Sequence, residues 1–405
     1  MAERAEDLTM RLPYAEVEFD DLGALIHPEQ VPAAVELIHA HRATDVLVLT
    51  HGWNSTLAQA RLQYAALIES LVHVRAEVRG AQARRLVVVG VLWPSSLWAA
   101  VVDSGPAALQ DQIRESMDDA ATARELQALV ARLRDAPEAA RTFIALLRTA
   151  LPDSSPGEDG AAFSALAHGD ADAVMAVALE TADENAERET GTGLVDRFWE
   201  ALRNLLNITA YYRMKERAGV VGRVGIASLL DRLDAGSPGT RIHLVGHSFG
   251  GRAAAAAALR TRAPLASLSL LQAAFSHYGM ARDWDGTRDG SFADVPAKVQ
   301  GPILVTFTRN DRVVGIAYPL ASRLARQIGS VLGDRNDPYG AIGRNGALKT
   351  PAALPPTELL EVGGTYRFQP GRVSSLDADA YIHGHADVTG PQVAYAVLSA
   401  VVAGQ

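Results

Sequence analysis

The stretch "RIHLVGHSFGGRAAAAAAL", residues 241–259, changes character in its middle. Its first part is a short apolar run, which is typical of a strand buried on both faces of a parallel sheet. Its last part is rich in alanine, the strongest helix former. Between the two, Gly246 and Gly250 flank Ser248. The sequence therefore predicts a strand, a sharp turn with a serine at its apex, and a helix.

This turn has physical consequences for the serine. A residue at so sharp a turn is forced into a strained backbone conformation. Glycines on either side, with Gly251 adding room, let the strand and the helix approach without Cβ clashes. The turn directs the hydroxyl of Ser248 over the carboxyl edge of the sheet, where open α/β sheets bind ligands. The N–H groups that begin the helix are aimed at the same place.

Further apolar runs and helical patterns alternate along the 405-residue chain. Other strands are predicted at 45–53, 84–94, 265–275 and 301–311, with a weaker candidate at 357–368. Apolar spacing typical of helices occurs at 29–41, 55–76, 312–329 and 391–403. This alternation predicts an α/β fold with a mostly parallel central sheet flanked by helices.

One interval breaks the alternation. Between Trp93 and Arg241 the chain is far longer than a simple crossover needs, and its apolar spacing is mostly helical. We expect a helical insertion at 96–221 and a sheet core built from 1–95 and 222–405. The insertion is either additional scaffold or a cap that shapes a substrate site, and the sequence leaves both open.

Composition excludes several classes of protein and site. The hydrophobic content of 48% and the charged content of 21% are ordinary for a soluble globular protein. The net charge of −9 disfavours binding to nucleic acids and to anionic membranes. The absence of cysteine excludes disulfides, a cysteine nucleophile and thiolate zinc sites. No apolar stretch suits a signal peptide or a membrane span, so we expect no transmembrane segment and a cytoplasmic location.

The pattern Gly246-His247-Ser248-Phe249-Gly250 fits G-x-S-x-G, with a predicted strand before it and a helix after it. In this context it resembles the nucleophile elbow of the α/β-hydrolase superfamily. The resemblance covers about 40–95 and 222–405 and does not extend to the insertion. It implies that Ser248 is the nucleophile of a catalytic triad, followed along the chain first by an acid and then by a histidine.

Three histidines follow Ser248 in the sequence. His277 comes directly after the next strand, which is too early for the chain order of the superfamily. His383 and His385 lie in "AYIHGHADVTGPQVAYAVL" (380–398), a loop before a final amphipathic helix. The resemblance places the base in such a loop. We favour His385 because it lies closer to the helix, with His383 as the alternative.

The acid is expected at Asp311, just past the predicted strand at 301–311. An aspartate there could accept the imidazole N–H and fix the tautomer of the base. Asp311 could also cap the following helix, and the two roles are compatible. Asp283 and Asp285 are rival acids, but they lie far past the end of the preceding strand.

A second turn, "VLVLTHGWNST" (46–56), follows the first strong strand. In lipases and esterases of the superfamily, an H-G-x turn at this place presents the amide of x to the oxyanion. The resemblance therefore implies that the backbone N–H groups of Trp53 and Phe249 form the oxyanion hole. We expect four further residues to line the site: His51, Gly52, Asn54 and His247. His51 would brace the turn, Asn54 would be an additional donor, and His247 would pack beside the nucleophile.

These roles together indicate a serine hydrolase that works through an acyl-enzyme and needs no metal or organic cofactor. The substrate class favoured is a carboxylic ester with an apolar acyl or alcohol part. A thioesterase or acyltransferase would use the same residues. A catalytically idle hydrolase fold used for binding remains a third possibility. The sequence does not indicate an oligomeric state.

Overall fold

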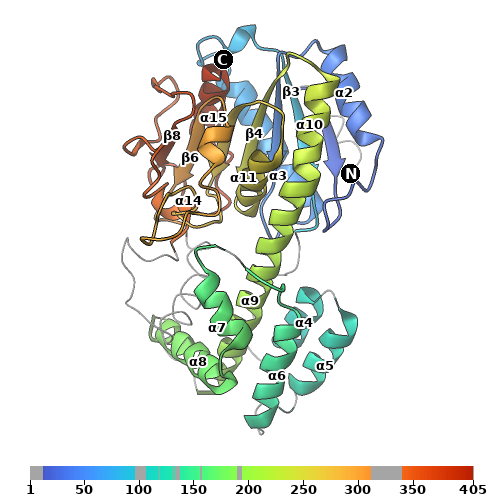
Figure 1. The fold of residues 1–405 in the computed structure, drawn as a ribbon, viewed down its shortest axis with the longest axis vertical. Helices are drawn as coiled ribbons and strands as arrows, with labels where there is room; N and C mark the ends of the chain where they lie inside the picture. Colours follow the sequence, from blue (N-terminus) through green and yellow to red (C-terminus); the bar gives the residue numbers. More distant parts are fainter. Residues whose placement is uncertain are drawn as a thin grey trace. The chain divides into compact units, whose positions relative to one another are not determined.

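The computed structural model describes residues 12–95, 106–117, 119–130, 132, 137–155, 157–188, 194–311 and 340–404. Its centre is an eight-stranded sheet in the order β1-β3-β2-β4-β5-β6-β8-β7, and every neighbouring pair of strands is parallel (Figure 1). The strands are β1 (Tyr14–Glu18), β2 (Asp45–Thr50), β3 (Leu86–Leu92), β4 (Arg241–His247), β5 (Leu265–Leu271), β6 (Ile303–Phe307), β7 (Thr357–Glu358) and β8 (Val373–Asp377). The predicted α/β architecture is confirmed.

The central strands are apolar throughout because both faces of the sheet are covered. Every residue of β2, β3 and β5 is buried, as expected for a parallel sheet between two helical layers. The register also aligns the strand ends. Thr50, the last residue of β2, pairs with Val91 of β3 and with Gly246 of β4. The turns that follow β2 and β4 therefore leave the sheet side by side at its carboxyl edge.

Two helical layers supply this cover. α3 (Leu57–Val74) and α15 (Pro391–Ala403) share an apolar core with one face of the sheet, including Leu49, Val245 and Leu271. α3 begins with a capping box, in which Thr56 and Gln59 satisfy each other's backbone N–H groups. The helices α2 (Gln30–Ala40), α10 (Ala227–Gly236) and α11 (Phe249–Arg260) and the π-helix η2 (Val221–Ile226) pack together in the other layer.

The helix that follows the predicted serine turn is packed unusually closely. The alanines of α11 from Ala253 to Ala258 are all buried. η2 approaches α11 so closely that a Cβ added at Gly222 would collide with the carbonyl oxygen of Ala253. Small side chains on both elements make this approach possible. α11 is therefore fixed between the sheet and η2.

The described residues form two compact units. The sheet unit lies within Met1–Ser95, Arg217–Val314 and Gly340–Gln405, and the other lies within Ser96–Glu216. The second unit contains α4 (Pro106–Ser116), α5 (Ala120–Val130), α6 (Pro137–Thr149), α7 (Gly160–His168), α8 (Ala171–Arg188) and the first part of α9 (Leu194–Val220). In this unit a buried ion pair joins Lys215 to Asp159, and Lys215 Nζ also donates to Ser155 Oγ at 2.8 Å. The domain boundaries drawn from the sequence stay a prediction.

Several elements differ from the sequence-based expectations. β1 and β8 have no counterpart among the predicted strands, and the weak candidate at 357–368 forms a strand only at Thr357–Glu358. Short elements also occur at η1 (Ala81–Ala83), α12 (Val295–Lys298) and α14 (Ile342–Asn345). The helix predicted at 312–329 lies outside the described residues. Within those residues, no helix combines the length and the apolar character needed to cross a membrane.

Candidate active site

Ser248 lies at the junction of β4 and α11, with φ 56° and ψ −125°. This conformation is costly for a residue with a side chain, and it persists only where the surroundings enforce it. Here the N–H and the carbonyl of Ser248 are both held by hydrogen bonds, one to the end of β5 and one to the segment that follows β5. The N–H of Ser248 donates to the Leu271 carbonyl at 3.1 Å, and its carbonyl accepts from the N–H of Ala274 at 2.9 Å.

The flanking glycines allow the turn to close. A Cβ added at Gly246 would collide with the backbone of Gly250. A Cβ added at Gly250 would collide with the carbonyl oxygens of Thr50 and His51. Both positions therefore require glycine because backbone, which cannot move aside, occupies the space that a side chain would need.

Ser248, His385 and Asp311 form a chain of hydrogen bonds. Nε2 of His385 lies 2.7 Å from Ser248 Oγ, and its Nδ1 lies 2.7 Å from Asp311 Oδ2. Asp311 is fully buried, His385 is 14% exposed by side chain, and Ser248 is 3% exposed. The carboxylate can only accept, so Nδ1 carries the proton of a neutral His385 and Nε2 offers its lone pair to the hydroxyl. The geometry permits transfer of the serine proton to the imidazole.

Hydrogen bonds hold the turn that bears Asp311 in place. Arg344 Nη1 donates to the carbonyl oxygen of Asp311 at 2.9 Å. The side-chain amide of Asn310 donates to the carbonyls of Asp379 and Ile382 at 2.9 and 3.0 Å. The Asn310 bonds fix the turn after β6 against the segment that leads to His385, and the Arg344 bond fixes the same turn against α14. The sequence pattern did not identify Asn310 or Arg344 as members of the site.

The rival candidates lie elsewhere. The side chain of His383 is exposed, and so are Asp283 and Asp285. Asp285 is engaged by Arg288, whose Nε donates to it at 2.6 Å. His277 is buried, and its Nδ1 lies 2.8 Å from the side-chain nitrogen of Asn345. Of the histidines that follow Ser248, the structure brings His385 to the serine.

His51 holds the turn after β2. Its Nε2 accepts from the backbone N–H of Trp93 at 3.3 Å, so the proton of the neutral ring is on Nδ1, which lies 3.0 Å from the carbonyl oxygen of Gly52. The ring also stacks on the Trp93 indole, with 5.4 Å between centroids. Burial lowers the pKa of His51 to about 4, so the ring stays neutral. The imidazole therefore fixes the Gly52 carbonyl.

This bond orients the peptide between Gly52 and Trp53. The C=O and N–H of a trans peptide point in opposite directions, so the N–H of Trp53 is directed away from His51. Gly52 lies against Ser248, because a Cβ added there would be 2.7 Å from Ser248 Cβ. The Trp53 and Phe249 rings meet edge to face at 5.7 Å. The two N–H groups predicted to hold an oxyanion therefore belong to neighbouring residues in space.

The backbone of Asn54 belongs to the turn after β2, and donation by its side chain at the site stays a prediction. Its φ is 57°, and its backbone N–H donates to the carbonyl oxygen of Ser95 at 2.9 Å. This N–H therefore stabilises the turn after β2 and is not directed at the serine. The side chain of Asn54 is exposed.

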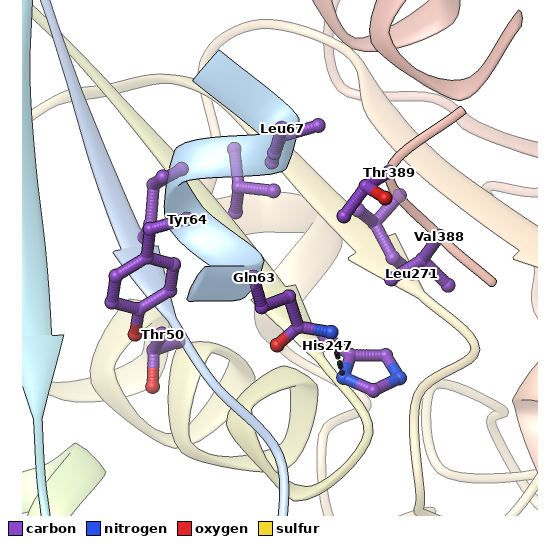
Figure 2. A pocket seen from close by; sticks show the side chains of 10 residues that line it. Thr50, Gln63, Tyr64, Leu67, His247, Leu271, Val388 and Thr389 are labelled. Carbon is purple, nitrogen blue, oxygen red and sulfur yellow. Dashed lines mark hydrogen bonds between the residues drawn. The ribbon is translucent and has the colours of Figure 1, made fainter. Parts of the chain in front are cut away.

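His247, the residue before Ser248, makes hydrogen bonds to two other segments of the chain. Its Nε2 lies 2.8 Å from the backbone carbonyl oxygen of His385, and its Nδ1 lies 3.1 Å from Nε2 of Gln63 on α3. Figure 2 shows the Gln63 amide directed at the imidazole. The residues around it line a small, partly open pocket with a volume of about 20 Å³: Leu49, Thr50, Gln63, Tyr64, Leu67, Val245, His247, Leu271, Val388 and Thr389. Gln63 gives no signal in the sequence because it is one polar residue on an amphipathic helix.

No group of three or more His, Asp or Glu side chains that could hold a metal ion occurs within the described ranges. No protein-family model, curated protein or solved structure matches this chain. The sheet, its flanking helices and the serine turn are compatible with an α/β-hydrolase-like fold.

Proposed function

We propose that the protein is a serine hydrolase that cleaves a carboxylic ester through an acyl-enzyme. The observation that carries the proposal is the chain of two 2.7 Å hydrogen bonds from Ser248 through His385 to Asp311. The serine lies at a strained turn before a helix N-terminus, where a nucleophile and its oxyanion donors can be combined.

The proposed reaction has two halves. In the first, Ser248 Oγ attacks the acyl carbon while His385 Nε2 takes the hydroxyl proton. The carbon–oxygen bond to the alcohol then breaks, and the imidazolium returns the proton to the departing oxygen. In the second half, His385 takes a proton from water, which attacks the acyl carbon of the acyl-enzyme. The bond from that carbon to Ser248 Oγ then breaks, and the imidazolium returns the proton to the serine oxygen, which releases the acid and the free serine. Asp311 stabilises the imidazolium in both halves.

The backbone N–H groups of Trp53 and Phe249 are the proposed donors to the oxyanion. Phe249 is the first residue of α11, and N–H groups of a first helical turn point out of the helix end. The N–H of Trp53 is oriented by the bond between His51 and the Gly52 carbonyl. A donor of this kind is typically worth about 3 kcal/mol of transition-state stabilisation.

The preference for an apolar substrate is supported by the partly exposed indole of Trp53, the residue that follows Gly52. Trp53 is partly exposed, and its ring meets that of Phe249. Large apolar faces next to a nucleophile favour apolar acyl or alcohol groups, because binding removes apolar surface from water.

A fluorophosphonate probe tests the nucleophile directly. We expect the wild-type protein to be labelled in a time-dependent way, and Ser248→Ala to remain unlabelled. Because only 3% of Ser248 is exposed, labelling also tests whether the hydroxyl is reachable. A wild type that stays unlabelled, or an alanine variant that labels equally, would contradict the proposal.

A series of aryl esters of increasing acyl length tests the substrate class. We expect turnover to rise with the first additions of methylene groups, at up to about 0.8 kcal/mol per buried CH₂. A thioester with the same acyl group, measured in parallel, separates an esterase from a thioesterase. Equal and negligible turnover of all esters would exclude the proposed substrate class.

A further inference from the structure

His247 is the neighbour of Ser248 on β4, yet its hydrogen bonds connect it to the base. The His385 carbonyl oxygen can only accept, so the 2.8 Å contact requires that His247 Nε2 carries a proton. The other ring nitrogen, Nδ1, lies 3.1 Å from the Gln63 side-chain nitrogen, which donates to it (Figure 2). Both nitrogens of a neutral imidazole are thereby satisfied, and the tautomer is fixed.

The surroundings keep this ring neutral. Burial lowers the pKa of His247 to about 3, and the adjacent His385 contributes to the shift. The two rings lie 4.9 Å apart between centroids. A neutral His247 can hold the base by a hydrogen bond without placing a second positive charge beside the imidazolium that forms during catalysis.

We propose that His247 is a positioning residue that fixes the main chain of the base His385 relative to the nucleophile. Holding the carbonyl of His385 restrains the Cα atom from which its ring projects. Because Ser248 follows His247 directly at the end of β4, one strand end sets the place of both the nucleophile and the base. Gln63 completes the arrangement from α3 by holding the tautomer that donates to His385. The inference rests on the proposed function, in which His385 is the base.

This role predicts a specific pattern of kinetic losses. A displacement of about 1 Å in a catalytic group can cost about 100-fold in rate. His247→Leu removes both ring nitrogens at similar volume, so His385 loses its anchor. His247→Gln keeps an N–H at a reach similar to that of Nε2. We therefore expect His247→Leu to be labelled by a fluorophosphonate at least about tenfold more slowly than wild type, and His247→Gln to recover most of that loss.

Leu67→Ala is the matched control. Leu67 lines the same pocket from α3 but makes no hydrogen bond to the base. We expect it to lower the midpoint of thermal unfolding and to leave the labelling rate close to that of wild type. If Leu67→Ala slows labelling as much as His247→Leu at an equal loss of stability, the effect of His247 is one of packing and the inference is wrong.

Other results of the same experiment would also support or overturn the role proposed for His247. A His247→Leu variant that labels at the wild-type rate would overturn the inference, and so would a folded His247→Gln variant that is as slow as His247→Leu. If His247→Leu does not fold, His247→Asn replaces it, because its shorter amide cannot reach the His385 carbonyl. A wild type that is never labelled would instead overturn the proposed function, so the two failures are distinguishable.

Discussion

Asp311 and His385 are 74 positions apart in the chain, yet Asp311 Oδ2 and His385 Nδ1 lie 2.7 Å apart. The carboxylate is fully buried, so its hydrogen bond to the imidazole offsets part of the cost of keeping a charge away from water. A buried carboxylate that accepts from the imidazole keeps the Nε2 lone pair directed at Ser248. The pair therefore determines which nitrogen of His385 presents a lone pair to Ser248, as the proposed mechanism requires.

Asp311→Asn should reduce the rate of fluorophosphonate labelling by about 10³- to 10⁴-fold, because an amide can donate to Nδ1 and stabilise the wrong tautomer. The rate of labelling and the turnover of an aryl ester measure the loss. Asp285→Asn changes an exposed aspartate engaged by Arg288 and should leave both rates unaltered. An active Asp311→Asn variant with an intact fold would remove Asp311 from the proposed mechanism.

Gly52→Ala should impair the reaction more than it impairs folding. The added Cβ would lie 2.7 Å from Ser248 Cβ, which is closer than van der Waals contact allows. Either the serine or the turn that carries the Trp53 amide must move, and we expect a loss of at least about 100-fold in turnover. The measurement is ester turnover, with thermal unfolding as the measure of folding.

Gly390→Ala is the control for that substitution. A Cβ added at Gly390 would meet only the side-chain oxygen of Gln392, at 3.9 Å. Its backbone is ordinary extended chain that alanine can adopt, so the cost in stability should be limited to the preference of an N-cap for glycine over alanine, about 1 kcal/mol or less. Turnover by Gly52→Ala equal to that of Gly390→Ala would show that the turn tolerates a side chain beside the nucleophile.

The residues of the candidate site differ in how far the sequence reveals them. Ser248, Asp311 and His385 each follow a recognisable strand or precede a recognisable helix, so their order along the chain could be compared with a known pattern. Gln63 and Asn310 could not be found in this way. Their part in the site consists of contacts between segments far apart in the sequence, and neither residue interrupts the local pattern of its own element.

The strands also differ in whether their own sequence is enough to predict them or whether contacts with distant segments are needed. β2, β3 and β4 were predictable because they are apolar runs buried on both faces. β8 was not, because Ser374 and Ser375 interrupt its apolar pattern although both are buried in the structure. Ser375 Oγ accepts from the N–H of Ala347 at 3.1 Å, a bond that satisfies its hydroxyl inside the protein. β1 was missed because it is a half-buried strand at the edge of the sheet.

Gly222→Leu should destabilise the protein by about 1–3 kcal/mol or more, because a new side chain must fit where η2 contacts the backbone of α11. Urea unfolding measures this change. Val224→Ala alters the same π-helix at a position that is 52% exposed and should change the free energy of unfolding by less than about 0.5 kcal/mol. Equal effects of the two substitutions would mean that the close approach of η2 and α11 does not limit stability.

A second cluster of aspartate, histidine and serine lies near the amino ends of β2, β4 and β5, at the edge of the sheet opposite to Ser248. His243 Nδ1 lies 2.8 Å from Ser267 Oγ, and its Nε2 lies 3.2 Å from Asp45 Oδ1. All three side chains are buried. Burial lowers the pKa of His243 even though the neighbouring carboxylate of Asp45 opposes the shift. We infer that this histidine stays neutral in the folded protein at pH values where it is protonated in the unfolded chain.

The sign of the resulting pH dependence follows from proton uptake. A histidine in an unfolded chain takes up a proton near pH 6.5, whereas folded His243 does so only at lower pH. Below about pH 6.5 the unfolded state therefore binds more protons, and the free energy of unfolding falls as the pH falls. The contribution of His243 to this slope is at most about 1.4 kcal/mol per pH unit, and the slope ends at its folded pKa.

His243→Gln should flatten this dependence while lowering stability at pH 8 by about 1–3 kcal/mol, because the amide cannot satisfy both Asp45 and Ser267 equally well. Urea unfolding at intervals between pH 8 and about pH 5 measures the slope. Ser267→Ala removes the hydroxyl but no titrating group, so its curve should run parallel to that of wild type at lower stability. If the curves of wild type and His243→Gln are parallel over this range, His243 takes up its proton equally in both states, and the lowered pKa inferred from its burial is wrong.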